Sequence, residues 1–498
     1  MKKEIRWGIL LNYILIICSN ISSILVVPSL IESMGMEIYG VYLLVFSTIA
    51  FFAVSDFGIG TSVISHIAKF KAAKDDVSLE NYIFWMFWVY LALALVVLML
   101  CSVIYICSPV FFKASLVWNE ILMFRKMFFI MSINCLLLFI QNFLFSIITG
   151  LGKLAFTRIC NIIKIIIRTA LFLNATAFKD ISYFVFVDLL LTILITIAFL
   201  IYALKLGTKM KCHFFDKPLL KQNISSIMSL YLMPISENFY WSVCNIIIAM
   251  HIGASSIGQF AIAVTFCQIY IQLSATLAHF RISRVSEIWT LQKENFKEYI
   301  FYTSRKQIVL LGAILIEFIL LGQLFLRIWV GEDFGISYYI AVIIIAALFF
   351  PSSQSMLEVW LYVRNKYFVR ALILACSAVA NTILIWFYAP KFGLIGIAGC
   401  IVVTTIVFKF IAMNIYYHRL NMYVKDFNLG IIAKSLPALA IAITVGLIIF
   451  KFVSGSIVLM LLNGIFALLI YVTILLFTYV KSTEKQRLRD MFDMFIPF

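Results

Sequence analysis

The chain has 498 residues, of which 64% are hydrophobic and only 12% are charged, with a mean hydropathy of +1.07. Soluble domains carry roughly 45–50% apolar and about 25% charged residues, so this composition excludes a soluble globular protein. The net charge of +16 would suggest nucleic-acid binding in a soluble protein, but in a membrane protein the positions of the charges decide its meaning.

Fourteen apolar stretches are long enough to cross a bilayer, for which a helix needs about 20 residues. The first follows the charged start MKKEIRW and continues to Leu30 without a cleavage site of small residues, which predicts a retained span rather than a signal peptide. The predicted spans are 9–31, 39–64, 81–107, 125–149, 155–178, 183–204, 226–250, 258–280, 307–328, 338–362, 367–389, 394–417, 430–452 and 456–480. We therefore expect an all-α integral membrane protein.

Lysine and arginine are distributed unevenly between the two sides of these spans. Of the 39 basic residues, 31 fall on segments that share the side of the N-terminus, counting the turn at 150–168 together with its helix entry, seven fall on the opposite side, and Lys409 lies inside a span. Because basic loops stay in the cytoplasm, we expect both termini in the cytoplasm of a multi-pass protein of the plasma (inner) membrane. This topology accounts for the positive charge, and no nucleic-acid partner is expected.

A short pattern recurs after 218 residues. MGMEIYGVYLL contains Gly35 and Gly40, HIGASSIGQFAI contains Gly253 and Gly258, and both read G-x4-G-x-aromatic at an outer turn. Such duplication is common in transporters, which bind their substrate between the repeats. The predicted organisation is a six-helix lobe at 1–204, a cytoplasmic linker at 205–225, a second six-helix lobe at 226–417, two additional helices at 418–480 and a cytoplasmic tail at 481–498.

Polar side chains inside the spans suggest a hydrated cavity. Asn161, Lys164 and Arg168 follow at i, i+3 and i+7, on one helix face. Arg168 lies about 18 Å into the membrane, so we expect it to face the cavity; the alternative is an ion pair with an acid such as Asp188. For Lys164 the alternative is an extended side chain that reaches the cytoplasmic interface. The other cavity candidates, each with packing between helices as its alternative, are Asn20, Gln141, Asn142, Asn238, Asn245, Gln268 and Gln272.

Three acids are candidates for gating or ion coupling, namely Asp56, Glu237 and Glu358. Asp56, in VSDFGIG, lies within the stretch at 39–64, which we interpret as one helix, about 12 Å from its inner end. Two glycines that follow it weaken a helix there. We favour a gate in which Asp56 pairs with a basic residue of the inner mouth, Lys153 or Arg158. Ion carriage and a permanent structural pair are the alternatives.

Several motifs are absent from the sequence. There is no Walker A motif, so this chain does not drive transport by ATP hydrolysis itself, and neither H-E-x-x-H nor G-x-S-x-G occurs. The ten cysteines form no C-x-x-C pair, which argues against a zinc site. We expect a transporter rather than an enzyme, with no metal and no cofactor, driven by a proton or sodium gradient if it is coupled.

The N-terminal region resembles the signature of polysaccharide exporters, the O-antigen and capsule-repeat (Wzx-type) flippases of the MATE-like multidrug/oligosaccharidyl-lipid/polysaccharide superfamily. That family shows a G-x-E-x-[YF]-G-x-[YF] turn after the first span and an acid–apolar–glycine motif at the end of the second. The matching residues here are Gly35, Glu37, Tyr39, Gly40 and Tyr42, followed by Asp56, Phe57 and Gly58. The turn at 253–260 and the stretch KFGLIGIAGC at 391–400 are similar to the corresponding turns of its second half.

The resemblance implies two six-helix lobes that open alternately to the two sides of the membrane, followed by two C-terminal helices. The substrate would be a polyprenyl-diphosphate-linked oligosaccharide repeat, moved from the inner to the outer leaflet for lipopolysaccharide O-antigen, capsule or a related polymer. Membrane lipid and the polymerase and chain-length proteins of that biosynthesis are the partners it implies. From their chemistry alone, Lys164 and Arg168 are the candidates for binding the diphosphate.

Two other functions compete with this one. A cation-coupled multidrug exporter of the same fold usually has twelve spans and an acidic cavity, whereas this sequence predicts fourteen spans and a basic helix face. A membrane glycosyltransferase or polymerase would need a folded outer loop, and the longest outer loop here spans roughly residues 108–124.

Overall fold

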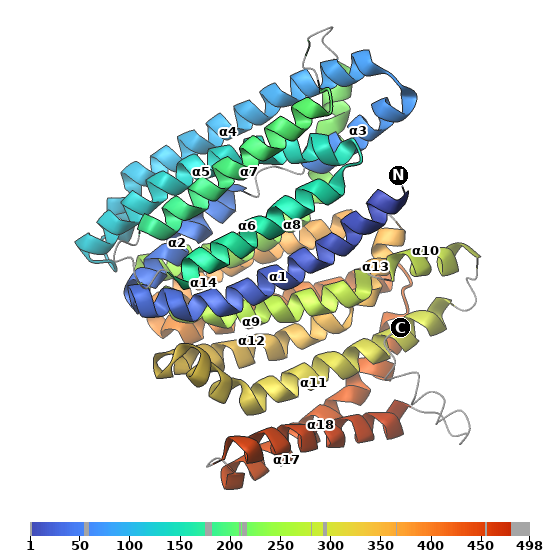
Figure 1. Ribbon diagram of the computed structural model, residues 1–498. Coiled ribbons are helices and arrows are strands. Elements are labelled where there is room, and N and C mark those ends of the chain that lie inside the picture. Colours follow the sequence, from blue (N-terminus) through green and yellow to red (C-terminus); the bar gives the residue numbers. More distant parts are fainter. Residues whose placement is uncertain are drawn as a thin grey trace. The chain divides into compact units, whose positions relative to one another are not determined.

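The computed structural model describes residues 2–53, 59–174, 182–208, 211, 217–279, 281–291, 296–364, 366–453 and 456–479. Within these ranges the regular structure is helical, without a strand (Figure 1). The chain divides into two compact units, Met1–Gly258 and Gln259–Phe498. The second predicted lobe began at 226, but the helix there, α8, packs against α2 and α3 of the first unit. The predicted boundaries of the two six-helix lobes, at 204 and 226, stay a prediction.

The first unit is built around α5, which packs against α2, α3, α4 and α7, while α1 lies along α6. Asp75 caps the start of α4, because its carboxylate accepts a hydrogen bond of 3.0 Å from the backbone N–H of Ser78. The helices are α1 (Lys2–Met34), α2 (Met36–Ala53), α3 (Ile59–Ala73), α4 (Asp76–Phe112), α5 (Trp118–Gly150), α6 (Leu154–Leu173), α7 (Ser182–Lys205) and α8 (Lys217–His251). The next helix, α9 (Ala254–His279), begins in this unit and continues into the second.

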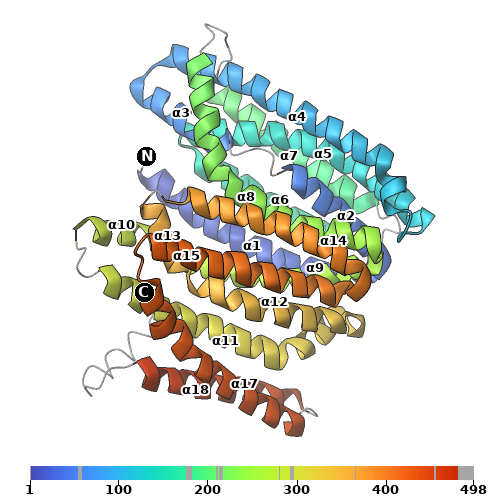
Figure 2. The ribbon, with the colours of Figure 1, turned by 180° about the vertical axis from the view of Figure 1, so that it is seen from behind.

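The second unit is organised along α11, which packs against α12 and also against the C-terminal pair α17 and α18 (Figure 2). Two of its elements are π-helical, η5 next to α14 and η6 before α17. After α9 the elements are α10 (Ile282–Leu291), α11 (Phe296–Val330), η4 (Glu332–Phe334), α12 (Gly335–Ser353), α13 (Ser355–Val363), α14 (Phe368–Thr404), η5 (Thr405–Ala412), α15 (Met413–Arg419), α16 (Val424–Phe427), η6 (Asn428–Ile432), α17 (Ala433–Val453) and α18 (Ile457–Tyr479).

Among the described residues, 10 helices are long and apolar enough to cross a membrane. One of them, the 52-residue stretch Phe368–Arg419, contains two predicted spans, which separate at Gly393 with its positive φ of 58°. The remaining predicted spans, 39–64, 155–178 and 226–250, lie on α2 and α3, on α6 and on α8. The protein is thus an all-α, multi-pass membrane protein, as the composition predicted.

The predicted helix at 39–64 covers α2, described as far as Ala53, and α3, described from Ile59. Residues 54–58 between them lie outside the described residues, so one continuous helix stays a prediction. Asp56 lies outside the described residues.

The recurring glycine pattern has a structural reason in the first unit. Gly35 and Gly253 both have a positive φ, of 75° and 134°, and both end a helix. The second glycine of each copy allows close approach: a Cβ on Gly40 would overlap the backbone carbonyl oxygen of Ala254, and a Cβ on Gly258 would lie 3.3 Å from Cδ1 of Tyr39. The two copies of the pattern therefore meet where α2 and α9 begin.

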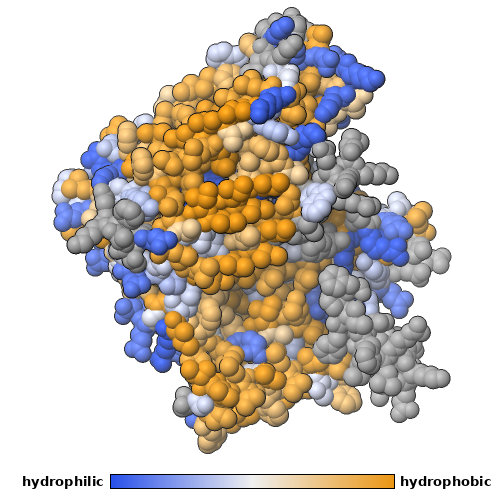
Figure 3. Space-filling model, in the orientation of Figure 1, coloured by the Kyte–Doolittle hydropathy of each residue, from blue (hydrophilic) through white to orange (hydrophobic). Residues whose placement is uncertain are grey.

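Much of the apolar surface is exposed, as a lipid-facing protein requires. Phe452 is 84% exposed, and Val110 and Phe477 are both 78% exposed. Figure 3 shows apolar side chains over most of the visible face, with hydrophilic ones mainly near the ends of the helices. Soluble proteins rarely expose so much contiguous apolar surface, so the described surface fits a protein embedded in lipid.

Candidate functional site

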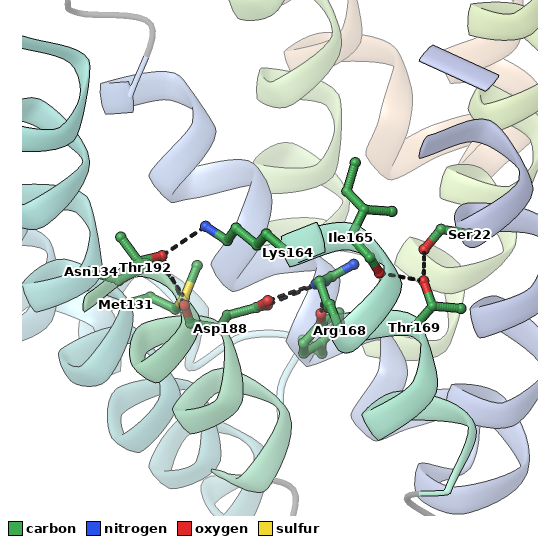
Figure 4. Close-up of polar contacts among 10 residues, drawn as sticks. Ser22, Met131, Asn134, Lys164, Ile165, Arg168, Thr169, Asp188 and Thr192 are labelled. Carbon is green, nitrogen blue, oxygen red and sulfur yellow. Dashed lines mark hydrogen bonds and ion pairs between the residues drawn. The ribbon is translucent and has the colours of Figure 1, made fainter. Parts of the chain in front are cut away.

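The clearest intramembrane polar site joins α6, α7 and α2 inside the first unit (Figure 4). Arg168 of α6 forms a two-bond ion pair with Asp188 of α7: Nε donates to Oδ1 at 2.6 Å and Nη2 donates to Oδ2 at 3.2 Å. Nη2 also donates to the hydroxyl of Tyr42 in α2 at 3.2 Å. The alternative to a cavity-facing Arg168, an ion pair with Asp188, is therefore present. Whether Arg168 also lines a transport cavity stays a prediction.

The residue pattern of α6 explains why its basic side chains point inward. Its exposed face is apolar and carries Ile159, Ile163, Ile166, Ile167, Ala170 and Leu173. The polar residues at 161, 164 and 168 occupy another face of the helix. Thr169 fixes α6 to α1 through a contact of 2.6 Å between its hydroxyl oxygen and that of Ser22.

Lys164 completes the cluster one turn before Arg168. Its Nζ donates to Oγ1 of Thr192 at 2.9 Å, and that hydroxyl in turn donates to the backbone carbonyl of Asp188 at 2.8 Å. Lys164 is thus held inside the bundle rather than extended to the cytoplasmic interface. Figure 4 shows Lys164 and Arg168 reaching toward α7 from the same helix.

The cluster carries a surplus of positive charge. It holds two cations and one carboxylate: Arg168 pairs with the buried Asp188, and Lys164 bonds the hydroxyl of Thr192 one turn along α7. The ring of Phe172 covers one side of the guanidinium, with Cζ of Arg168 at 4.4 Å from its centroid. The Arg168 side chain remains 28% exposed, and its Nη1 makes no hydrogen bond with any described residue. This donor is available to an anion.

The neutral candidates do not gather around this cluster. Asn20 and Asn238 donate to the backbone of their own helices, at Ile16 and Pro234. Asn245 of α8 donates to Oγ of Ser47 in α2 at 2.7 Å, which is a contact between helices. The others are buried Gln141, half-buried Asn142, Asn161 and Gln268, and exposed Gln272. Their roles in a cavity stay predictions.

The two described acidic candidates differ in their surroundings. Glu358 of α13 forms an ion pair of 2.7 Å with Arg370 of α14, and the two side chains are 24% and 14% exposed. Arg370 also donates to the hydroxyl of Tyr362 at 3.2 Å. Glu237 of α8 is half-buried. Among the described residues, no group of three His, Cys, Asp or Glu side chains could hold a metal ion.

Sequence reasoning missed two members of the cluster. The sequence marks Tyr42 only as an aromatic residue of the recurring turn and of the family signature, although its hydroxyl accepts a hydrogen bond from Arg168. Thr192, the partner of Lys164, carries no signal of its own. It lies four residues after Asp188, on the same face of α7, so the spacing to a predicted acid was the available clue.

No protein-family model matches the sequence, and no curated protein matches it. Solved structures match along most of the chain. The lipid II flippase MurJ in an inward closed conformation is 18% identical, with 94% of this chain and 98% of that chain covered, at a TM-score of 0.68.

Multidrug transporters match over less of the chain. An inward-facing multidrug resistance MATE family transporter of the MOP superfamily is 13% identical, with 81% of this chain and 94% of that chain covered, at a TM-score of 0.66. The MATE multidrug transporter DinF-BH is 12% identical, with 83% of this chain and 95% of that chain covered, at a TM-score of 0.59. At these identities the similarity shows the fold alone, and the protein is a multi-pass membrane protein with the MATE-like fold of MOP superfamily transporters.

Proposed function

We propose that the protein is a flippase that moves a polyprenyl-diphosphate-linked oligosaccharide from the inner to the outer leaflet. The observation that carries this proposal is the cationic cluster of α6, in which Lys164 and Arg168 exceed the charge of Asp188 by one and Nη1 of Arg168 has no described partner. An arginine with a donor to spare suits a phosphate oxygen. A multidrug exporter of cationic compounds would instead need an excess of negative charge.

The extent of the structural match supports the same function. The lipid II flippase aligns with 94% of this chain, while the two multidrug transporters align with 81% and 83%. A match over nearly the full length favours a flippase of a lipid-linked sugar over a multidrug exporter. The resemblance of residues 35–42 to polysaccharide exporters narrows the proposal to repeat units of O-antigen, capsule or a related polymer.

The remaining features of the proposal follow from the sequence. Both termini would lie in the cytoplasm of the plasma membrane, and transport would be coupled to protons or sodium without a bound cofactor. The partners would be the polymerase and chain-length proteins of polysaccharide assembly. Single-cysteine labelling with an impermeant reagent tests the topology: residue 213 should react only after the cells are opened, and reaction in intact cells would refute it.

Reconstitution into liposomes tests the transport function. Vesicles would contain a polyprenyl-diphosphate lipid with a fluorescent sugar, and an impermeant reductant would report the fraction exposed in the outer leaflet. The protein should accelerate exchange of the diphosphate lipid and should discriminate against the same lipid with a neutral linkage. Equal exchange of both lipids, or export of cationic dyes without exchange of the diphosphate lipid, would overturn the proposal.

A further inference from the structure

Glu317 is an acidic side chain at the middle of an apolar span. It lies ten residues after the start of the stretch at 307–328, or about 15 Å along the helix, half of the roughly 30 Å hydrocarbon thickness. Its side chain forms no hydrogen bond or ion pair with any described residue. A charged carboxylate at this depth costs several kcal/mol and is a candidate for function by default.

The C-terminal helices pack closely around this position. Leu320 of α11 meets α17 at Gly446, where an added Cβ would lie 2.7 Å from its Cδ1. One turn away, α18 meets α11 at Gly464, where an added Cβ would lie 2.6 Å from Oε2 of Glu317. Both views of the ribbon show α17 and α18 beside α11 (Figures 1 and 2). The carboxyl group is therefore set against the backbone of α18.

The hydrogen-bonding groups of this interface favour a neutral, protonated carboxyl. Asn463, next to Gly464, donates from Nδ2 to the carbonyl of Gly446 at 2.9 Å. Its Oδ1 is buried and has no hydrogen-bond donor among the described residues. The interface therefore has acceptors in excess, and an ionised Glu317 would add another acceptor and a charge. A protonated carboxyl is uncharged and supplies a donor.

The other titratable groups on the elements packed against this part of α11 do not neutralise Glu317. The hydroxyl of Tyr338 in α12 donates to the carbonyl of Ile319 at 2.6 Å, and that of Tyr471 in α18 donates to the carbonyl of Ile308 at 3.0 Å. Lys451, in the last turn of α17, is exposed. No described cationic side chain lies within ion-pair distance of Glu317.

We propose that Glu317 is a proton-binding site that couples protonation to the packing of α17 and α18 on α11. The carboxylate takes a proton from hydronium, which leaves as water, and forms an O–H bond, and the neutral side chain fits the closed interface. When the interface admits water, the proton returns to a water molecule and the carboxylate remains hydrated. The site is independent of the transported substrate, and so is its test.

Infrared difference spectroscopy of the full chain in lipid nanodiscs, between acid and alkaline pH, tests the protonation. The wild-type protein should show a protonated-carboxyl band that disappears on alkalinisation and is absent from Glu317→Gln. The control is Glu298→Gln, the same change at an exposed position in the first turn of α11, which should keep the band. Identical difference spectra for the wild type and Glu317→Gln would overturn the proposal. If Glu317→Gln does not fold, Glu317→Asp serves instead, because moving the carboxyl by one methylene should shift the band.

Thiol labelling tests the coupling to packing. Ala467 of α18 is fully buried, and its Cβ lies 3.4 Å from the position of a Cβ on Gly446. In a background without the ten native cysteines, Ala467→Cys should react faster at alkaline pH, and Glu317→Gln should remove that acceleration. A labelling rate that rises equally with and without Glu317, after correction for thiol ionisation, would refute the coupling.

Discussion

The ion pair between Arg168 and Asp188 can be tested by a double-mutant cycle. Removing one partner of a buried pair leaves an uncompensated charge and costs about 3–5 kcal/mol, whereas replacing both partners with apolar side chains is often close to neutral. Asp188 has a side chain 9% exposed and Arg168 one 28% exposed, so Asp188 is the costlier residue to leave alone. We therefore expect Arg168→Met to destabilise the protein by about 3 kcal/mol, the lower end of this range, because Lys164 stays in the cluster.

Equilibrium unfolding in mixed micelles measures the four free energies of the cycle. The matched control is the ion pair between Arg284 and Glu287 on α10. Its N–O distance is 2.8 Å, but the side chains of Arg284 and Glu287 are 55% and 51% exposed. Its coupling energy should stay below about 1 kcal/mol. If the coupling between Arg168 and Asp188 is no larger than that of the exposed pair, the reasoning about burial is refuted.

The same double variant separates structure from function. Arg168→Met with Asp188→Leu should restore most of the stability lost by Arg168→Met alone, because the buried carboxylate is gone and Lys164 keeps its hydrogen bond to Thr192. If Arg168 also contacts the diphosphate, the stable double variant should still exchange the lipid at least tenfold more slowly than the wild type, which corresponds to about 1.4 kcal/mol. Normal exchange by the double variant would assign Arg168 to the fold alone.

Three further predictions follow from single positions. Gly40→Ala should lower stability by about 1–3 kcal/mol, since its Cβ would overlap the Ala254 carbonyl, whereas Gly258→Ala, 3.3 Å from the buried ring of Tyr39, should cost less in the same unfolding assay. Asp75→Ala should destabilise the start of α4, measured by hydrogen exchange. Because hydrogen bonds from Ser78 lower the pKa of Asp75, that difference should be full near neutral pH and vanish as the pH falls through the lowered pKa. Asp56→Asn should impair export at normal abundance if Asp56 is a gate; normal export would exclude both gating and ion carriage.

The sequence predicted the membrane class and the spans because hydropathy is a property of each segment by itself. It also predicted the recurring turns, since Gly35 and Gly253 are needed wherever φ is positive. The partners of Arg168 were harder to predict, because Tyr42 comes from a helix 126 residues away. The contact of Glu317 with Gly464 was hard to predict for the same reason, because neither segment carries a sequence signal that α18 packs on α11 at the level of Glu317.

The intramembrane acids differ in what a proton would have to displace. Glu358 is held by Arg370 at 2.7 Å, so protonating it would first leave an arginine without its counter-charge, at a cost of several kcal/mol. Asp188 is held in the same way by Arg168. Glu317 has no such partner among the described residues, so it exchanges its proton with water without breaking an ion pair. If transport is driven by protons, Glu317 is therefore better placed than Glu358 to carry them, and Glu317→Gln should abolish the dependence of lipid exchange on a pH gradient while Glu358→Gln should mainly lower stability.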